Sequence, residues 1–357
     1  MKKSLLSLCI LGTLPVAAFA QSTATSLSNV TAKNEVIIFG VADMAIIAES
    51  GGPAGPVNKL TSGVASGSRL GFQGAHEIRP GLSAYVWLEG GLLMDTGNSA
   101  QGGSLFGRQA FAGLRGNVGS ITLGRQYTPA AMVQVEMDPF ITGTAGTSAN
   151  LLSPGGAGGS NRMNNAIKYN APANMGGFNA EWAYAFGEVA GNTTASSENG
   201  GNVGYMQGPF SVKAAYHTVN TAASLAQKVQ WVAGKYDFGL FTGYVNFVSN
   251  RGSTVFGVPN ANSSDVLLGI SAPIAGGRFM VSSITLKDNT AAQRNANQFA
   301  LGYDYFLDKS TDIYVSWAHI NNSNAPIVVG VSGYRVGNAT EQGSGNAAFT
   351  LGGRYSF

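Results

Sequence analysis

Apolar and polar side chains alternate with a period of two residues along almost the whole sequence. In the segment 82–89, LSAYVWLE, leucine, alanine and valine occupy every second position, and tyrosine, tryptophan and glutamate occupy the positions between them. Successive side chains of a β-strand point to opposite faces, so this period is typical of a strand with one apolar face. The chain is therefore expected to be an all-β protein built from many antiparallel strands.

The alternating segments predict about sixteen strands of roughly ten residues each, the length that a tilted strand needs to cross a membrane. The expected strands are residues 36–48, 66–76, 81–94, 105–115, 119–128, 162–171, 177–187, 200–207, 209–219, 226–237, 239–249, 263–272, 276–287, 296–306, 311–320 and 346–357.

The connections between the expected strands are alternately long and short. Residues 49–65 and 129–161 form long connections, whereas 77–80, 116–118 and 172–176 form short ones. Outer-membrane barrels have tight turns at one end and longer loops at the other, whereas a soluble sandwich has no reason to alternate in this way. The pattern predicts a transmembrane antiparallel β-barrel in which one domain uses nearly the whole chain.

The polar faces of the strands carry many Arg, Lys, Glu, Gln and Asp residues. Unpaired charges are costly in a closed core, so we expect these faces to line water inside the barrel. The apolar faces would then contact outer-membrane lipid, with Tyr and Phe near the strand ends forming the interfacial girdles.

The first residues have the pattern of an export signal. Lys2 and Lys3 precede an apolar stretch over residues 5–18, and Ala18-Phe19-Ala20 matches a signal-peptidase site. We expect a cleaved signal peptide over residues 1–20 and a barrel domain over residues 21–357. The alternative, a retained helical anchor, is disfavoured because the apolar stretch is shorter than the ~20 residues that span a bilayer.

Composition excludes several other classes of protein. Cleavage after Ala20 would remove Cys9, the only cysteine, so the mature chain could form no disulfide. The two lysines lost with it lower the formal charge from +3 to +1, which argues against a nucleic-acid partner. No uncharged apolar stretch of ~18 residues follows, which argues against a helical membrane protein.

Motifs for catalysis or cofactor binding are missing from the sequence. His76, His217 and His319 lack the spacing of a metal site, and no serine lies in a Gly-x-Ser-x-Gly motif. The glycines in the segment 155–159 are not followed by the Gly-Lys-Ser/Thr of a phosphate-binding loop. We therefore expect no catalytic residues, no metal and no cofactor.

Several motifs together resemble the general-diffusion porins of the Gram-negative, beta-proteobacterial outer membrane. They are Ser68-Arg69-Leu70-Gly71-Phe72-Gln73-Gly74, Gly81-Leu82-Ser83-Ala84, Phe106-Gly107-Arg108-Gln109-Ala110-Phe111, Leu123-Gly124-Arg125-Gln126-Tyr127-Thr128-Pro129, Asp304-Tyr305-Phe306-Leu307 and the closing Gly353-Arg354-Tyr355-Ser356-Phe357. The resemblance implies a sixteen-stranded homotrimeric barrel whose third long loop folds into the lumen. It also implies that Phe357 is part of the signal read by the barrel-assembly machinery.

Two segments depart from the pattern of this family. Residues 75–78, AHEI, replace the usual Glu-Asp-Leu, and Asp308 stands where the family often has a serine. Both departures fall on expected turns, so they concern the rim of the barrel and leave the fold unchanged.

The long connection 129–161 is the candidate for the loop in the lumen. Its charged residues are Glu136 and Asp138, and residues 139–161 carry no charge. In the family that the chain resembles, this loop narrows the pore, and its acidic residues face arginines on the opposite wall. The alternative is that Glu136 and Asp138 only solvate an external loop.

Alternation predicts which charged side chains of the expected strands point into the lumen. They are Arg69, Arg108, Arg162 and Lys168, together with Glu89. Arg125 instead shares a face with Ile121 and Leu123, and a lipid-facing arginine costs roughly 2–4 kcal/mol at the midplane. We therefore expect Arg125 to lie at a subunit interface, unless its side chain reaches the polar edge of the membrane.

These expectations describe a water-filled channel for passive passage of ions and small hydrophilic solutes, with self-association into a homotrimer. Basic residues outnumber acidic ones near the expected constriction, which predicts a mild preference for anions. Two alternatives stay open at this point: a substrate-selective channel for small organic anions or amino acids, and a non-conducting adhesin or structural barrel.

Overall fold

The computed structural model describes residues 34–152, 161–223, 226–255, 258–324, 327–328 and 331–357. The predicted signal peptide, residues 1–20, lies outside the described residues. Within the described part of the chain, no helix is long and apolar enough to cross a membrane.

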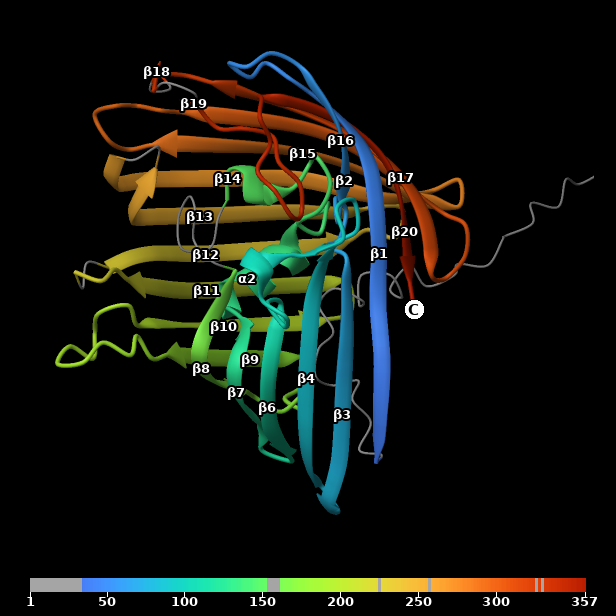
Figure 1. Ribbon diagram of the computed structural model, residues 1–357, viewed down its shortest axis with the longest axis vertical. Helices are drawn as coiled ribbons and strands as arrows, with labels where there is room; N and C mark the ends of the chain where they lie inside the picture. Colours follow the sequence, from blue (N-terminus) through green and yellow to red (C-terminus); the bar gives the residue numbers. More distant parts are fainter. Residues whose placement is uncertain (1–33, 153–160, 224–225, 256–257, 325–326, 329–330) are drawn as a thin grey trace, which may run out of the picture.

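Sixteen long antiparallel strands of the described residues form a closed barrel (Figure 1), because β1 pairs with β3 on one side and with the last strand, β20, on the other. The strands are β1 (Glu35–Ser50), β3 (Arg69–Arg79), β4 (Leu82–Leu93), β6 (Gln109–Gly116), β7 (Gly119–Tyr127), β8 (Arg162–Asn170), β9 (Phe178–Ala185), β10 (Glu198–Gln207), β11 (Phe210–Asn220), β12 (Ala226–Asp237), β13 (Thr242–Val255), β14 (Val258–Ile274), β15 (Gly277–Asp288), β16 (Ala296–Phe306), β17 (Thr311–Asn322) and β20 (Ala347–Ser356). Each overlaps one of the strands expected from alternation, so the predicted barrel is confirmed.

The long connections of the barrel contain several short strands and turns. β2 (Val57–Ser62) pairs with the second half of β1 and was not expected, since its residues fall in the predicted loop 49–65. The other short strands and turns are β5 (Asn98–Ser99), β18 (Ile327–Val328), β19 (Val331–Ser332), η2 (Gln101–Gly103) and η3 (Ser148–Asn150).

Alternation of burial along the strands matches alternation in the sequence. On β1, Val36 and Ile38 are exposed on the outside, whereas Asp43 and Glu49 are buried on the inside. On β20, Phe349, Leu351 and Tyr355 are exposed together on the outer face. The outside of the barrel is therefore apolar, the reverse of a soluble barrel.

The loop that follows β7 lies inside the barrel, where Figure 1 shows its helix α2 (Pro129–Met137). The apolar side chains of this loop form one core cluster with inward-facing apolar residues of β11 to β17, β20 and β1, which is a difference from the uniformly polar lumen that we expected. The loop residues include Val133, Met137, Phe140 and Leu152, and the strand residues include Trp231, Leu267, Met280 and Ile320. An inward-facing apolar residue is stable here because the loop shields it from water.

Candidate pore constriction

We call residues 128–152, the first part of the loop between β7 and β8, the inner loop. Thr128 caps α2, since its Oγ1 accepts a hydrogen bond from Ala131 N at 3.2 Å, and Pro129 occupies the first helical turn. Both residue types favour the start of a helix. The tip of the inner loop is attached to the wall by Ala145 N, which donates to Ser316 Oγ on β17 at 3.2 Å.

Glu136 lies on α2 and is paired with lysines of the barrel wall. Its Oε2 is 2.5 Å from Lys213 Nζ on β11, and Lys235 Nζ on β12 donates to the Glu136 carbonyl oxygen at 3.2 Å. The helix is also held by Asn246, whose Nδ2 donates to Met137 O at 2.9 Å. The structure thus places Glu136 inside the barrel, but beside lysines, where we expected arginines.

Asp138 is buried at the end of α2 and organises the tip of the inner loop. Its Oδ1 accepts from Phe140 N at 2.9 Å, and its Oδ2 accepts from Thr142 N and Ser148 N at 3.0 and 2.8 Å. Burial raises the pKa of Asp138, and these hydrogen bonds act in the opposite direction. In this structure the carboxylate binds backbone groups of its own loop.

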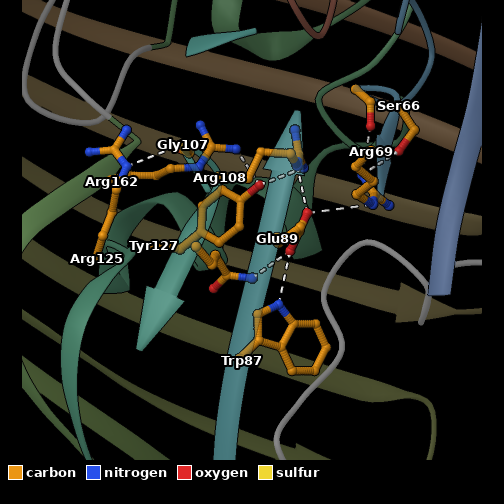
Figure 2. A network of polar contacts seen from close by, with 11 residues as sticks. Ser66, Arg69, Trp87, Glu89, Gly107, Arg108, Arg125, Tyr127 and Arg162 are labelled. Carbon is orange, nitrogen blue, oxygen red and sulfur yellow. Dashed lines mark hydrogen bonds and ion pairs between the residues drawn. The ribbon is translucent and has the colours of Figure 1, made fainter. Parts of the chain in front are cut away.

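Glu89 is the centre of a polar network on the inner wall, shown in Figure 2. Its Oε1 is 2.5 Å from Arg108 Nε and 3.5 Å from Arg69 Nε, and its Oε2 accepts from Trp87 Nε1 at 3.1 Å. Arg69 Nη1 also donates to Gly67 O at 3.0 Å. Arg69 of β3 and Arg108 of the connection before β6 therefore share one carboxylate.

Arg162 joins this network through Tyr127, as Figure 2 shows. The Tyr127 hydroxyl oxygen accepts from Arg108 Nη2 at 2.8 Å and from Arg162 Nη2 at 2.5 Å. The Arg162 guanidinium also lies over the Tyr127 ring, 4.3 Å from its centroid. We call Arg69, Arg108, Arg162 and Glu89 the arginine cluster.

Arg108 and Arg162 lie on the inner wall, but not for the reason that alternation along a regular strand would give. The prediction for Arg108 rests on regular alternation with Phe111, which would then face lipid; instead Phe111 is buried on the inner face, where its ring stacks on Trp87 with a centroid distance of 6.3 Å. Arg108 precedes β6 and reaches Glu89 from the connection before that strand. On β8 the register shifts beside Asn165 (φ 50°), so Met163, and not Arg162, is buried in phase with Lys168.

Lys168 lies outside the arginine cluster and is paired with an acidic residue. Its Nζ is 2.5 Å from Glu181 Oε2 on β9 and donates to Tyr127 O at 3.3 Å. Glu181 also accepts from Asn202, whose Nδ2 donates in addition to Pro129 O. Lys168 and Glu181 therefore brace the start of the inner loop.

Two further ion pairs cross the inner wall between other strands. Arg278 Nη2 on β15 is 2.6 Å from Asp304 Oδ2 on β16, and Arg354 on β20 binds Asp312 on β17. Each of these arginines has a carboxylate of its own, in contrast to the arginine cluster.

Arg125 lies beside exposed Ile121 and Leu123, in keeping with its predicted position on the outer face. Its side chain is half-buried and already bound within the protomer, since Nε donates to Gly107 O at 2.7 Å and Nη1 donates to Asn164 Oδ1. Phe357 is exposed at the end of the chain, and its backbone N and O form hydrogen bonds of 3.1 and 3.0 Å with O and N of Gly40. The last residue thus pairs with β1 at the seam of the barrel.

Sequence reasoning missed four residues of the inner wall: Tyr127, Glu181, Lys213 and Lys235. Alternation could have found the two lysines, because Lys213 is in phase with buried Ala215 and Lys235 with buried Trp231. Tyr127 carried no such signal, because its contacts depend on the register shift in β8.

The barrel with an apolar exterior, a loop in its lumen and charged side chains on its inner wall defines a membrane-spanning channel protein. Residues 7–325 match the model of a Gram-negative porin family, and the chain belongs to this family. It is accordingly a multi-pass protein of the Gram-negative outer membrane that forms a channel for passive diffusion.

Individual relatives agree with this assignment. The chain is 32% identical over 341 residues to outer membrane porin protein 32 of Delftia acidovorans, covering 91% of each chain. It is 30% identical over 307 residues to an outer membrane porin protein of Bordetella pertussis, covering 74% of this chain and 79% of the relative. Among solved structures, an anion-selective porin from Comamonas acidovorans superposes with a TM-score of 0.75 at 28% identity, covering 90% of this chain and 99% of that one.

Proposed function

We propose that the protein is a homotrimeric general-diffusion porin with a mild preference for anions, and that it moves ions and small hydrophilic solutes without chemical change. The observation that carries the proposal is the arginine cluster, in which Arg69 and Arg108 share the single carboxylate of Glu89 and Arg162 joins them through Tyr127. A cluster with more positive than negative groups attracts anions, and its field acts over a longer range in a pore with low-dielectric walls than at an open surface.

The position of the inner loop supports this selectivity. Its apolar side chains share one core cluster with residues of β11 to β17, β20 and β1, whereas the arginine cluster comes from β3, β4, β8 and the connection before β6. Of the two acidic side chains of the loop, Glu136 is paired with Lys213 and lies beside Lys235, which binds its carbonyl oxygen, and Asp138 is buried against backbone N–H groups of the loop itself. The loop therefore narrows the lumen without pairing an acidic side chain with the arginines. The solved porin that superposes well on this chain is described as anion-selective, which fits the same proposal.

The outer face supports the proposed trimer. Arg125 lies beside exposed Ile121 and Leu123 on the outer face, so an isolated protomer would leave it uncovered. A neighbouring subunit would cover this face, and the remaining apolar belt would contact outer-membrane lipid.

Reversal potentials across a planar bilayer with a KCl gradient test the proposed selectivity. The wild-type channel should give an anion-directed potential, and Arg69→Ser combined with Arg108→Ser should shift the potential toward cations. Arg278→Ser combined with Arg354→Ser is the matched control, because it removes two inward-facing arginines from carboxylate pairs outside the cluster. We expect a smaller shift from the control. A cation-directed wild-type potential, or equal shifts in the two variants, would contradict the proposed role of the cluster, and a barrel without conductance would contradict the channel itself.

A further inference from the structure

Tyr127 connects two arginines that come from opposite sides of its own strand. It is the last residue of β7, which lies between β6 and β8 in the barrel wall. Arg108 approaches from the connection before β6, and Arg162 is the first residue of β8 and the register partner of Tyr127. The tyrosine hydroxyl receives a hydrogen bond from each guanidinium, at 2.8 and 2.5 Å.

The chemistry of the phenol suits this position in an anion channel. Two guanidinium groups repel each other, so they lie close together only if an acceptor between them offsets the repulsion. A carboxylate would do so, but its charge would cancel one of the two positive charges. A neutral hydroxyl oxygen accepts charge-assisted hydrogen bonds from both groups and leaves both charges in place.

The tyrosine ring makes a second contribution that a smaller hydroxyl residue could not make. Arg162 stacks over the ring at 4.3 Å from its centroid, within the range of a cation–π interaction. This contact fixes the plane of the guanidinium without adding a negative charge. The ring and the hydroxyl of one residue thus orient Arg162 together.

We propose that Tyr127 is a positioning residue that determines selectivity, because it holds Arg108 and Arg162 side by side with their charges intact. This inference rests on the proposed anion preference. Tyr127 also directly precedes Thr128, the cap of α2, and its carbonyl oxygen accepts from Lys168 Nζ at 3.3 Å. The spacing of the arginines is therefore set at the point where the inner loop leaves the wall.

Tyr127→Phe tests the proposal, because it removes the shared acceptor and keeps the ring. We expect the ratio of chloride to potassium permeability to fall by roughly twofold, since an unanchored guanidinium spends less time at the narrow zone. Tyr169→Phe is the matched control: Tyr169 is exposed on β8 and donates to Val118 O at 2.5 Å, away from the cluster. The control should keep the wild-type permeability ratio, and both variants should keep the wild-type melting temperature of the folded barrel.

A comparison of single and double variants shows whether Tyr127 acts by positioning the arginines or by a general effect on the barrel. In an Arg162→Gln background, Tyr127→Phe should change the permeability ratio by less than half of its effect in the wild type, because one of the two anchored groups is gone. Equal effects in both backgrounds, or an unchanged ratio in Tyr127→Phe alone, would overturn the inference. Tyr127→Gln provides a second variant that keeps an acceptor oxygen without the ring, and it should lie between wild type and Tyr127→Phe.

Failure of the proposed function gives a different result from failure of this inference. A wild-type channel without anion preference contradicts the proposed function, whatever Tyr127 does. The positions of the two guanidinium groups in a crystal structure of Tyr127→Phe then decide the inference: displaced groups support it, and groups that stay in contact overturn it.

Discussion

Glu136 Oε2 on the inner loop lies 2.5 Å from Lys213 Nζ on β11, so this acidic side chain is paired outside the arginine cluster. In the simplest picture of such a channel, acidic groups of the loop face arginines across the pore, and the two sets of charges oppose each other. Here the arginines have Glu89 on their own wall, and the loop has its own lysines. The two charged groups can therefore be changed separately.

Replacement of Glu136 with Gln should increase the preference for anions. The change leaves Lys213 and Lys235 without the carboxylate that balances them, so the lumen gains a net positive charge. We expect the ratio of chloride to potassium permeability to rise by roughly twofold. The double variant Glu136→Gln with Lys213→Gln should return the ratio toward the wild-type value, and reversal potentials measure both. A ratio that falls in Glu136→Gln would show that the pair acts mainly by holding α2 in place.

Replacement of Asp138 with Asn should loosen the tip of the inner loop. An amide accepts hydrogen bonds at one of its two terminal atoms, so it cannot accept from Phe140 N, Thr142 N and Ser148 N in the present arrangement. We expect a higher size limit for neutral sugars in liposome swelling and noisier single-channel currents. Ser148→Ala is a graded comparison, because it keeps the backbone donor to Asp138 and removes only the hydroxyl contacts with Asp138 and Gln134, so its effect should be smaller. An unchanged size limit would indicate that packing of Phe140 and Leu152 against the wall is sufficient to fix the loop.

The strands could be predicted from the sequence because the outer faces must be apolar in a membrane. The segment 226–237, for example, was expected as a strand and has these bounds in β12. The inner faces were harder to interpret, since residues such as Trp231 and Met280 face inward and are apolar. Their environment depends on which part of the inner loop covers them, and alternation along a strand contains no information about that contact.

Alternation along the strand explains the inward position of Arg69 but not that of Arg162. Arg69 lies inward because exposed Leu70 and Phe72 point outward, as alternation predicted. Arg162 follows a different rule, because the register shift beside Asn165 displaces the alternation by one residue. The start of α2, by contrast, was available in the sequence, since Thr128 and Pro129 form a cap followed by a proline in the first turn.

Replacement of Arg125 with Leu should alter the proposed trimer and leave the pore unchanged. Arg125 lies on the outer face, so its loss removes no charge from the lumen, and its bond to Gly107 O involves the backbone before Arg108 and no guanidinium group of the cluster. We expect single-pore conductance equal to that of wild type and a shifted dissociation temperature of the trimer on gels run in mild detergent. Asn164→Ala is the control, because it removes one acceptor of Arg125 within the protomer and keeps the charge. A wild type that migrates as a monomer in gentle detergent would contradict the interface.

Asp308 lies in the tight turn between β16 and β17, at the position where the family resemblance implied a serine. Its Oδ1 accepts from Ser310 N at 2.7 Å and from Thr311 N at 2.8 Å, so it caps the turn as a serine hydroxyl would. The hydrogen bond from Ser310 N, more than any other contact, holds the pKa of Asp308 below its ordinary value. A carboxylate with a lowered folded-state pKa stabilises the folded state fully above its unfolded pKa, and this contribution is lost as the pH falls through the folded value.

Asp308→Ala should therefore be slightly less stable than wild type at neutral pH, and the difference should shrink as the pH falls from about 4 to below the folded pKa. Asp308→Ser should retain the cap without this dependence on pH, since a hydroxyl does not titrate in this range. The effect should be small, because the turn is open to water and the carboxylate is screened. Urea unfolding in lipid vesicles, followed by tryptophan fluorescence over a series of pH values, measures all three proteins. A difference between wild type and Asp308→Ala that stays constant down to the lowest pH would mean that the side chain acts by its shape and not by its charge.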